Sequence, residues 1–531
     1  MTDHAYGIDL GTTYSAIAYV DANDTVEVAE NQEGQPTTPS VIYFESDSNT
    51  VVGVEAKNGA VTAPDDTCTL IKRKMGTEYE VEYQGQSFKP EELSALILKE
   101  LVQTANAFTG FDTNKVVITV PEYFGQQERE ATRQAGQIAG LDVLSIVAEP
   151  VAAGTSLGLK NLGDDDAEKM LTVYDLGGGT FDTTVMAVQR GNIRVIETGG
   201  DRLLGGADWD KALIDLLVEK LAEAAGADAL DLRMEEDFMA ELALKAEDTK
   251  KSLTRRESVQ VRMHVAGERV SAEVSRDEFE TATASLLQST ISLSRDTIER
   301  AKQKEPGLEV EKVLLVGGSS RMPQVRKAIE SELGYECQDT EFDLSVAKGA
   351  AILAKAIIDG VVDDSEREVT GDTSEQRLYL GGAQSLRIQN VLGRGVGIEF
   401  YDPEKDEHHI SFVAHTSDQI PSEQEPIDAQ TVADNQTTTQ IKVYEQAGDT
   451  ESRDPANNRL LKEMSLDLGG PVPKGSPIEI HTRISAEGVI FVHARDPKSG
   501  NENSMEATVS LMSAEDVEKA TAKVSAIAVR G

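Results

Sequence analysis

Cysteine is nearly absent from this chain. Only Cys68 and Cys337 occur in 531 residues, without CxxC spacing. Two such thiols exclude a disulfide framework and fit a reducing compartment. The sequence also lacks an apolar run of roughly 18 residues, the length that a membrane-spanning helix needs. Met1 to His4 lacks the basic and apolar segments of a signal peptide, so we expect a cytoplasmic protein.

Positive charge is scarce as well. The chain has 51 Lys and Arg against 93 Asp and Glu, a formal net charge of −42. Such a field repels nucleic acid and anionic lipid, so neither is an expected partner. No D-x-[DN]-x-[DN]-G loop is present, which disfavours a calcium-binding surface. We interpret the acidity as an adaptation to a salt-rich cytoplasm, where screening weakens self-repulsion.

Both standard nucleotide motifs are missing, since there is no G-x-x-x-x-G-K-[ST] and no glycine turn opens the helix of a Rossmann fingerprint. Instead, one unit occurs twice, at Asp9 to Ser15 and at Asp175 to Asp182. Each unit is an aspartate and a glycine-threonine turn between two apolar strands. Glycines let main-chain N–H groups converge on a phosphate, and facing aspartates can hold hydrated Mg²⁺. The repeat predicts a nucleotide clamped between two similar halves.

A third glycine turn follows a later apolar strand. Val313 to Val316 leads into Gly317-Gly318, and a helix is expected to begin near Pro323. Bare glycines permit the close approach of a flat ring, on which Arg321 could stack.

Four segments, in this order and spacing, resemble one family. They are Asp-Leu-Gly-Thr-Thr-Tyr-Ser at 9–15, Val-Ile-Thr-Val-Pro at 117–121, Asp-Leu-Gly-Gly-Gly-Thr-Phe-Asp at 175–182 and Val-Gly-Gly-Ser-Ser-Arg-Met-Pro at 316–323. The family is the DnaK-type seventy-kilodalton heat-shock chaperones, within the actin, hexokinase and heat-shock ATPase superfamily. The resemblance covers nearly the whole chain. It implies a chaperone that binds unfolded or extended polypeptides and hydrolyses ATP, with Mg²⁺, optionally K⁺, and a nucleotide-exchange factor as partners.

The resemblance also assigns site residues. The catalytic set is Asp9, Lys72, Glu149, Asp175, Thr180 and Asp182, of which Asp9, Glu149 and Asp175 would hold Mg²⁺ through water. The nucleotide-binding set is Gly11, Thr12, Thr13, Tyr14, Gly177, Gly178, Gly179, Thr180, Glu247, Lys250, Lys251, Thr254, Gly317, Gly318, Ser319, Arg321 and Asp343. Taken alone, Lys72 could be a solvated lysine, and the helix around Glu247 a solvated charged face. Lys251 replaces the family's usual arginine, so weaker nucleotide binding is expected.

The chain divides by its sequence patterns into four parts. Residues 1–360 alternate strand and helix patterns, which predicts an α/β domain. The resemblance implies that this domain is a two-lobed actin-like ATPase. Residues 361–390 lose apolar periodicity, as in a linker, and residues 391–511 show the short alternating strands of an all-β sandwich. A capping box at Ser513 begins one short C-terminal helix within residues 512–531, a truncated form of the family's lid.

The chain departs from the family where the two domains communicate. The family's apolar linker ending in aspartate is replaced by Leu386 to Asn390, which has polar positions and no acid, so we expect weak docking. Ser145, Ala148 and Val151 replace an arginine, an asparagine and a threonine that meet the J-domain co-chaperone and the docked linker. J-domain control is therefore doubtful. The family's interdomain switch pair, Pro121 and Arg129, remains.

The peptide-binding positions are also altered. The resemblance places Ile398, Tyr401, Val432, Thr439 and Ile441 around the peptide cleft, with Tyr401 and Val432 as an arch over it. Thr439 stands where a pocket-lining valine is expected, and its hydroxyl disfavours a leucine side chain. The alternative function is an ATP-gated binding or regulatory module with one dedicated partner.

Overall fold

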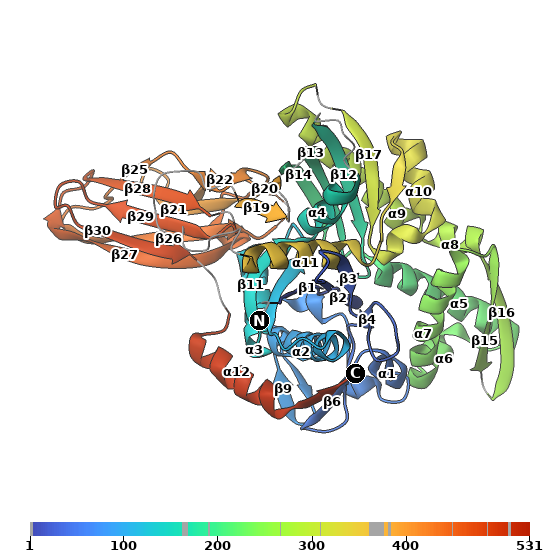
Figure 1. The fold of residues 1–531 in the computed structure, drawn as a ribbon. Coiled ribbons are helices and arrows are strands. Elements are labelled where there is room, and N and C mark those ends of the chain that lie inside the picture. The colour runs from blue at the N-terminus through green and yellow to red at the C-terminus, as the bar shows by residue number, and fades with distance from the viewer. Residues whose placement is uncertain are drawn as a thin grey trace.

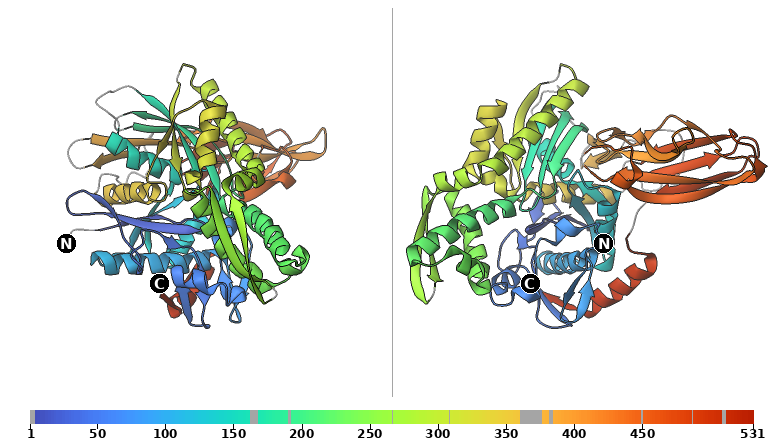
Figure 2. Two further views of the ribbon diagram at one scale, coloured as in Figure 1. Left: turned by 90° about the vertical axis from the view of Figure 1, so that its right-hand side faces the viewer. Right: turned by 180° about the vertical axis from the view of Figure 1, so that it is seen from behind.

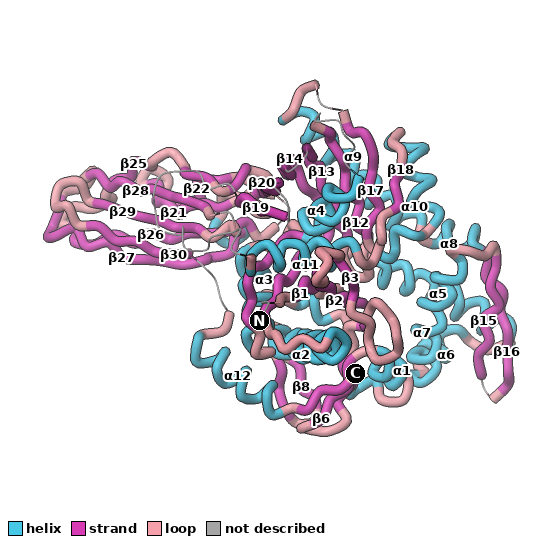
Figure 3. Tube along the Cα trace, viewed as in Figure 1, coloured by secondary structure: helices cyan, strands magenta, loops and turns pink. Residues whose placement is uncertain are grey.

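A two-lobed α/β body carries a β-sandwich on one side (Figure 1). The computed structural model describes residues 4–161, 168–189, 192–265, 267–307, 309–359, 376–380, 384–448, 450–485, 487–507 and 511–531. Most helices lie in the body, whereas the sandwich is built of strands and loops (Figure 3). Among the described residues, no helix has both the length and the apolar character needed to cross a membrane.

The first lobe is formed by the N-terminal part of the chain. Its elements are β1 (Tyr6–Asp9), β2 (Tyr14–Val20), β3 (Val26–Val28), β4 (Thr38–Pro39), β5 (Ile42–Phe44), β6 (Asn49–Val52), α1 (Val54–Gly59), β7 (Thr67–Cys68), β8 (Val81–Tyr83), β9 (Gln86–Phe88), α2 (Pro90–Thr109), β10 (Lys115–Val120), α3 (Gln126–Ile138), β11 (Asp142–Ala148) and α4 (Glu149–Asn161). Its main sheet has the order β11-β10-β1-β2-β3, with β4 paired to β2. β1 pairs in parallel with β10 and antiparallel with β2, so the first glycine turn lies at the end of a central strand.

The second lobe repeats this arrangement. Its elements are β12 (Lys169–Leu176), β13 (Phe181–Gln189), β14 (Asn192–Asp201), α5 (Gly206–Ala225), α6 (Ala229–Arg233), α7 (Glu236–Leu253), β15 (Ser258–Val265), β16 (Glu268–Ser275), α8 (Arg276–Ala282), α9 (Ala284–Lys304), β17 (Val310–Val316), α10 (Pro323–Ala328), β18 (Cys337–Asp339) and α11 (Ser345–Ile358). Its sheet contains the run β18-β17-β12-β13-β14. The pair β12-β13 holds the second glycine turn, as β1-β2 holds the first.

The two lobes meet through α11, which lies between them (Figure 1). A β-carbon placed on Gly7 of β1 would lie 2.0 Å from the main-chain nitrogen of Ala351. One placed on Gly349 would lie 1.7 Å from the carbonyl oxygen of Ala152 in α4. Only glycine fits at these two contacts. The close packing brings the central strands of both lobes, and hence their glycine turns, to one cleft.

The edge of the second-lobe sheet is extended by β19 (Gln376–Leu380) and β20 (Gln384–Val391). β20 runs parallel to β14, with Ile388 opposite Ile193, and antiparallel to β19. This corrects our interpretation of residues 361–390 as a linker, because part of that range forms strands of the ATPase sheet. Residues 361–375 and 381–383 of the predicted linker lie outside the described residues.

The sandwich follows β20 and agrees with the predicted strand pattern. Its strands are β21 (Val396–Asp402), β22 (Glu407–Ala414), β24 (Ser422–Glu423), β25 (Ile427–Gln430), β26 (Gln436–Gln446), β27 (Asn458–Val472), β28 (Pro477–Ile484), β29 (Ile490–Arg495) and β30 (Glu502–Ala507). The short strand β23 (Gln419–Ile420) instead pairs antiparallel with β20 of the second-lobe sheet. One sheet has the order β22-β21-β26-β27, and the other β24-β28-β29-β30 with β25 beside β28. Apolar residues such as Ile398, Val443, Ile480 and Val492 form the core.

The last described residues form α12 (Ala514–Ala526) and β31 (Ala528–Arg530). Ser513 and Asp516 make the predicted capping box at the start of α12. Two features differ from the predicted truncated lid. A strand follows the helix and pairs in parallel with β6, and the helix packs on α2 and α3 of the first lobe. Two further views show this location (Figure 2).

Candidate functional site

The two glycine-threonine turns face each other in the cleft between the lobes. A β-carbon placed on Gly178 would lie 1.8 Å from Thr13 Oγ1, and one on Gly179 would lie 2.2 Å from Thr12 Cγ2. The second turn therefore needs glycine because the threonines of the first turn lie directly against it. The predicted residues of both turns are brought to one place.

Local hydrogen bonds hold each turn in shape. In the first turn, the Gly11 main-chain nitrogen donates to Ser15 Oγ (3.1 Å), and Ser40 Oγ donates to the Gly11 carbonyl oxygen (2.8 Å). In the second turn, the Gly177 nitrogen donates to the Thr180 carbonyl oxygen (3.1 Å). Each turn thus satisfies part of its own main chain. Ser40 had no recognisable signal in the sequence.

A ring of carboxylates lies beneath the turns. Asp9 ends β1, Asp175 lies near the end of β12, Asp182 lies in β13 and Glu149 begins α4. Burial and then repulsion from Glu149 raise the pKa of Asp9, Asp175 and Asp182 above the ordinary value. Asp182 Oδ1 has no hydrogen-bond partner among the described residues. The donor set is all oxygen and carries excess negative charge, which fits a hydrated divalent cation.

Lys72 supplies positive charge within this ring. Its Nζ donates to Glu149 Oε1 at 2.6 Å, and both side chains are buried. Burial alone would lower the pKa of Lys72, but attraction to Glu149 and Asp9 outweighs burial and raises it. Lys72 lies in a 3₁₀ turn that begins after Leu70, whose φ is 57°. A buried lysine paired with a carboxylate is charged at neutral pH and can stabilise an anion in the cleft.

The helix α7 supplies the next predicted group. Lys251 Nζ donates to Tyr14 OH at 2.8 Å and pairs with Glu247 Oε1 at 2.7 Å, so these three predicted residues are in contact. Lys250 instead donates to the Gly206 carbonyl oxygen (2.9 Å) and pairs with Asp210 (2.8 Å). Lys250 is therefore engaged by α5, although it is near the cleft.

A cross-lobe contact involves a residue that the sequence did not indicate. Lys57 of α1 forms an ion pair with Glu247, and its Nζ donates to Tyr14 OH at 2.6 Å. Burial would raise the pKa of Glu247, but Lys57 and Lys251 together lower it to about 2. The pair joins the first lobe to the second across the cleft. A single lysine in a short helix is usually solvated, so no pattern pointed to Lys57.

The third glycine turn lies beside the second. Gly317 has a φ of 79°, and its nitrogen donates to the Phe342 carbonyl oxygen at 2.9 Å. Arg321 forms an ion pair with Asp343 at 2.6 Å, and its guanidinium lies 4.4 Å from the centre of the Phe342 ring. These contacts hold the predicted stacking residue in place. Phe342 was not predicted, because one aromatic residue in a loop gives no pattern.

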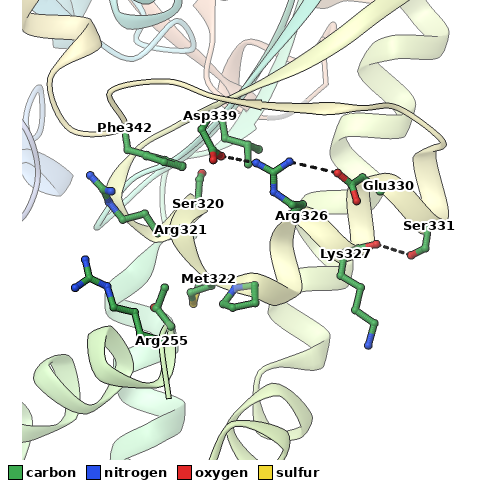
Figure 4. A pocket seen from close by; sticks show the side chains of 13 residues that line it. Arg255, Ser320, Arg321, Met322, Arg326, Lys327, Glu330, Ser331, Asp339 and Phe342 are labelled. Carbon is green, nitrogen blue, oxygen red and sulfur yellow. Dashed lines mark hydrogen bonds and ion pairs between the residues drawn. The ribbon is translucent and has the colours of Figure 1, made fainter. Parts of the chain in front are cut away.

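A pocket of about 740 Å³ opens beside this turn (Figure 4). Two of the predicted nucleotide-binding residues, Thr254 and Arg321, line it. The other lining residues are Arg255, Leu315, Ser320, Met322, Pro323, Arg326, Lys327, Glu330, Ser331, Asp339 and Phe342. In the close-up, Arg321 and Arg255 lie at one end of the pocket and Ser331 lies toward the other. The structure thus places the residues that follow α7 and those of the third turn around a common cavity.

The predicted switch pair lies between the carboxylate ring and the sandwich. Arg129 Nε donates to the Phe124 carbonyl oxygen at 3.1 Å. In the same segment, the carbonyl oxygen of Tyr123 accepts a hydrogen bond from Arg394 Nε of the sandwich (3.3 Å), and the Phe124 nitrogen donates to the Pro121 carbonyl oxygen (3.2 Å). The segment that begins at Pro121 therefore contacts the sandwich directly.

The predicted peptide-binding residues are spread over β21, β26 and a loop. Ile398 and Ile441 lie on these neighbouring strands and are buried in the sandwich core. Thr439 is half-buried, and Tyr401 OH donates to Asp406 Oδ1 at 2.6 Å. Val432 lies between β25 and β26 and is exposed. The structure does not gather the five residues into a single exposed group.

Comparison with known proteins gives a consistent result. The family model described as Hsp70 protein matches residues 5–82 and 77–530. A protein of Halobacterium salinarum named chaperone protein DnaK is 35% identical over 508 residues, which cover 94% of this chain and 74% of the relative. A chaperone protein DnaK of Thermotoga petrophila is 35% identical over 515 residues, covering 94% of this chain and 80% of the relative. With its two facing glycine-threonine turns and this match along nearly its whole length, the chain belongs to the Hsp70 family of ATPases.

Proposed function

We propose that this protein is a cytoplasmic DnaK-type chaperone that hydrolyses ATP and binds extended polypeptide segments. The observation that carries the proposal is the contact between the two glycine-threonine turns above Lys72 and the carboxylate ring. Hydrolysis of a phosphoanhydride requires a positioned phosphate, neutralised charge and an oriented water molecule. The turns and the ring offer groups for each of these tasks.

The side chains divide this work. The main-chain nitrogens of the two turns, with the hydroxyls of Thr12, Thr13 and Thr180, would hold the phosphate oxygens. Lys72 Nζ would neutralise charge on the terminal phosphate, and Asp182 or Glu149 would accept a hydrogen bond from the attacking water. The excess negative charge of the ring fits Mg²⁺, held through water by Asp9, Glu149 and Asp175. When bound, Mg²⁺ would neutralise phosphate charge.

The nucleoside would lie between α7 and the third turn. Glu247, Lys251 and Thr254 offer polar groups on one side, and Arg321 offers a planar cation on the other. Because Lys251 is an ammonium on a flexible stem, it cannot stack on adenine as a guanidinium does. We therefore expect weaker nucleotide binding than with arginine at this position.

The sandwich would bind the polypeptide, and Thr439 is the residue that tests this assignment. Thr439→Val removes a hydroxyl from a half-buried position and should tighten binding of leucine-containing peptides. The matched control is Thr438→Val, on the neighbouring exposed position of β26. The experiment is a fluorescence titration of a panel of unrelated unfolded peptides. A panel to which wild type does not bind at all would contradict the chaperone function and favour one dedicated partner.

Partner proteins of the ATPase cycle are proposed by class. A nucleotide-exchange factor fits a cleft bridged by an ion pair between the lobes. J-domain stimulation should be small, because Ser145 replaces an arginine and lies near Glu487 of the sandwich, with 3.5 Å between Ser145 Oγ and Glu487 Oε1. The measurement is the steady-state ATPase rate with and without a J-domain protein from the same cell.

A further inference from the structure

After the sandwich, residues 512–531 return to the first lobe, and we call this segment the clasp. Both Figure 1 and Figure 2 show α12 beneath the first lobe and β31 at its small sheet. The sandwich is therefore connected to the ATPase body at both of its ends. It is joined to the second-lobe sheet through β20 and to the first lobe through the clasp.

The apolar side of α12 is part of the first-lobe core. Met512, Ala520, Val524 and Ile527 are all buried in the cluster that contains the apolar residues of α2 and α3. Val517 and Val529 pack at the edge of this cluster. Exposing these side chains would forfeit the hydrophobic stabilisation of their burial. The helix is thus integrated into the lobe and does not lie loosely on its surface.

Polar contacts fix both sides of the helix. Lys99 Nζ of α2 donates to the carbonyl oxygens of Val524 (3.1 Å) and Ile527 (2.9 Å), which satisfies main-chain acceptors at the C-terminal end of α12. Lys523 Nζ pairs with Glu92 Oε1 at 2.9 Å and lies 3.6 Å from the centre of the Phe88 ring. Both lysines therefore tie α12 to the same region around α2.

The strand β31 adds main-chain bonds to these contacts. The Ala528 nitrogen donates to the Ser48 carbonyl oxygen at 2.8 Å, and Val529 lies opposite Thr50 in the pairing with β6. Arg530 forms ion pairs with Glu45 (2.8 Å) and Glu55 (2.7 Å). β31 thereby completes a four-stranded sheet of order β31-β6-β5-β7.

The docked sandwich also contacts the first lobe through a group of buried charges. Glu445 Oε1 accepts a hydrogen bond from the Gln126 nitrogen at the start of α3 (2.9 Å). Arg394 and Arg459 each pair with Glu128 of α3 at 3.2 Å. Glu445 lies at the N-terminus of α3, where an acid is favourable, and separating the domains would break its hydrogen bond and both ion pairs.

We propose that the clasp keeps the sandwich docked on the ATPase body whether ATP or ADP is bound. The inference concerns the control of the proposed chaperone cycle and rests on that function. A ligand shifts a conformational equilibrium only by its differential affinity for the two states. The clasp contacts α2, α3 and β6, and its strand pairing and apolar contacts use none of the proposed nucleotide-binding residues. A bound nucleotide would therefore not directly touch the groups that make the strand pairing and apolar contacts of the clasp.

One link of ion pairs between the clasp and the nucleotide site runs through α1. Glu55 of α1 pairs with Arg530 of the clasp, and Lys57 of the same helix pairs with Glu247 across the cleft. Opening the cleft would move α1 and disturb the ion pair between Glu55 and Arg530. The buried face of α12 and the main-chain bonds of β31 would remain.

The first test is amide hydrogen exchange of the full chain at molar KCl, without nucleotide, with ADP and with ATP and Mg²⁺. For each amide of α12, β31 and β6, we expect the exchange rates in the three conditions to agree within about twofold. Exchange of the α12 and β31 amides more than tenfold faster with ADP than with ATP would overturn the proposal. The measurement needs no peptide, so a failure of peptide binding is distinguishable from a failure of the clasp.

The second test weakens the clasp without deleting it. The double variant Lys523→Glu/Arg530→Glu should speed exchange of the β31 amides at least tenfold, because both ion-pair anchors become repulsive. The control Lys519→Glu/Lys405→Glu makes the same charge change at exposed lysines that contact nearby acids of α12 and of the β21–β22 hairpin. Equal exchange in the two variants would overturn the role of these anchors. A nucleotide-dependent exchange that appears only in the first variant supports the clasp.

Discussion

At the scale of single residues, Lys72 brings a positive charge to the carboxylate ring through its contact with Glu149. Lys72→Ala should nearly abolish ATP turnover and leave ATP bound, since a donor to the terminal phosphate acts mainly in the transition state. Loss of one such preorganised donor typically costs roughly 2.7–4 kcal/mol. Single-turnover hydrolysis and a nucleotide titration measure the two effects.

The control for this variant is Lys74→Ala, in the same 3₁₀ turn but exposed. It should hydrolyse ATP at nearly the wild-type rate. A Lys72→Ala rate within about threefold of wild type would reject the assignment, since about 1.4 kcal/mol corresponds to a factor of ten.

Glu247 is the residue whose charge joins the lobes, and its pKa of about 2 makes its contribution pH-dependent. A carboxyl group whose pKa is lowered in the folded state stabilises that state fully above its ordinary value of 4.5. The contribution is lost as the pH falls toward 2. Glu247→Gln should therefore lower the melting temperature at pH 7, and the difference from wild type should shrink at pH 3.

The matched control for this pH dependence is Glu241→Gln. Glu241 lies on the same helix and pairs with Lys245 at i+4, with both side chains substantially exposed. Exposed pairs of this kind contribute little to stability. A melting difference for Glu247→Gln that stays constant from pH 7 to pH 3 would contradict the cross-lobe ion pair.

At the scale of elements, the sequence predicted what is set locally. The start of α10 at Pro323 and the capping box at Ser513 are both present, because caps and proline act within one turn of chain. The glycine turns could be predicted because their strand-turn-strand pattern repeats. Lys57 and Phe342 could not, because they join the site only through the tertiary packing of α1 and of the loop before α11.

The docking of β20 shows the limit of judging a strand by its side chains. The polar positions of Leu386 to Asn390 led us to expect weak docking, yet the segment pairs with β14. Strand pairing uses main-chain N–H and C=O groups, which every residue except proline supplies in full. Side-chain polarity therefore did not decide whether this strand forms.

Main-chain pairing can be tested at one position of β20. Ile388→Pro removes an N–H from a strand that pairs with β14 on one side and β19 on the other, so it should detach this edge. We expect the amides of β14 near Ile193 to exchange at least tenfold faster. Ile388→Val keeps the N–H and should leave exchange nearly unchanged. Equal protection in both variants would show that β20 does not depend on this pairing.

At the scale of the whole molecule, the net charge of −42 dominates. Repulsion among exposed carboxylates opposes the compact state, and salt weakens it, because the Debye length falls from about 10 Å at 0.1 M to about 3 Å at 1 M. The melting temperature should therefore rise when KCl is raised from about 0.1 M to about 1 M. A thermal scan that shows no rise would contradict the interpretation of the acidity as a salt adaptation.

The pairing of β31 with β6 also constrains how the chain can be made. Thr50 and Ala528 approach each other although they are 478 positions apart. At a synthesis rate of about 5–20 residues per second, roughly 25–100 s pass between the synthesis of β6 and that of its partner strand β31. The first lobe is therefore the earliest part to emerge from the ribosome and among the last to be finished. During that interval its open strand edge and the apolar surface that α12 later covers are exposed to other nascent chains.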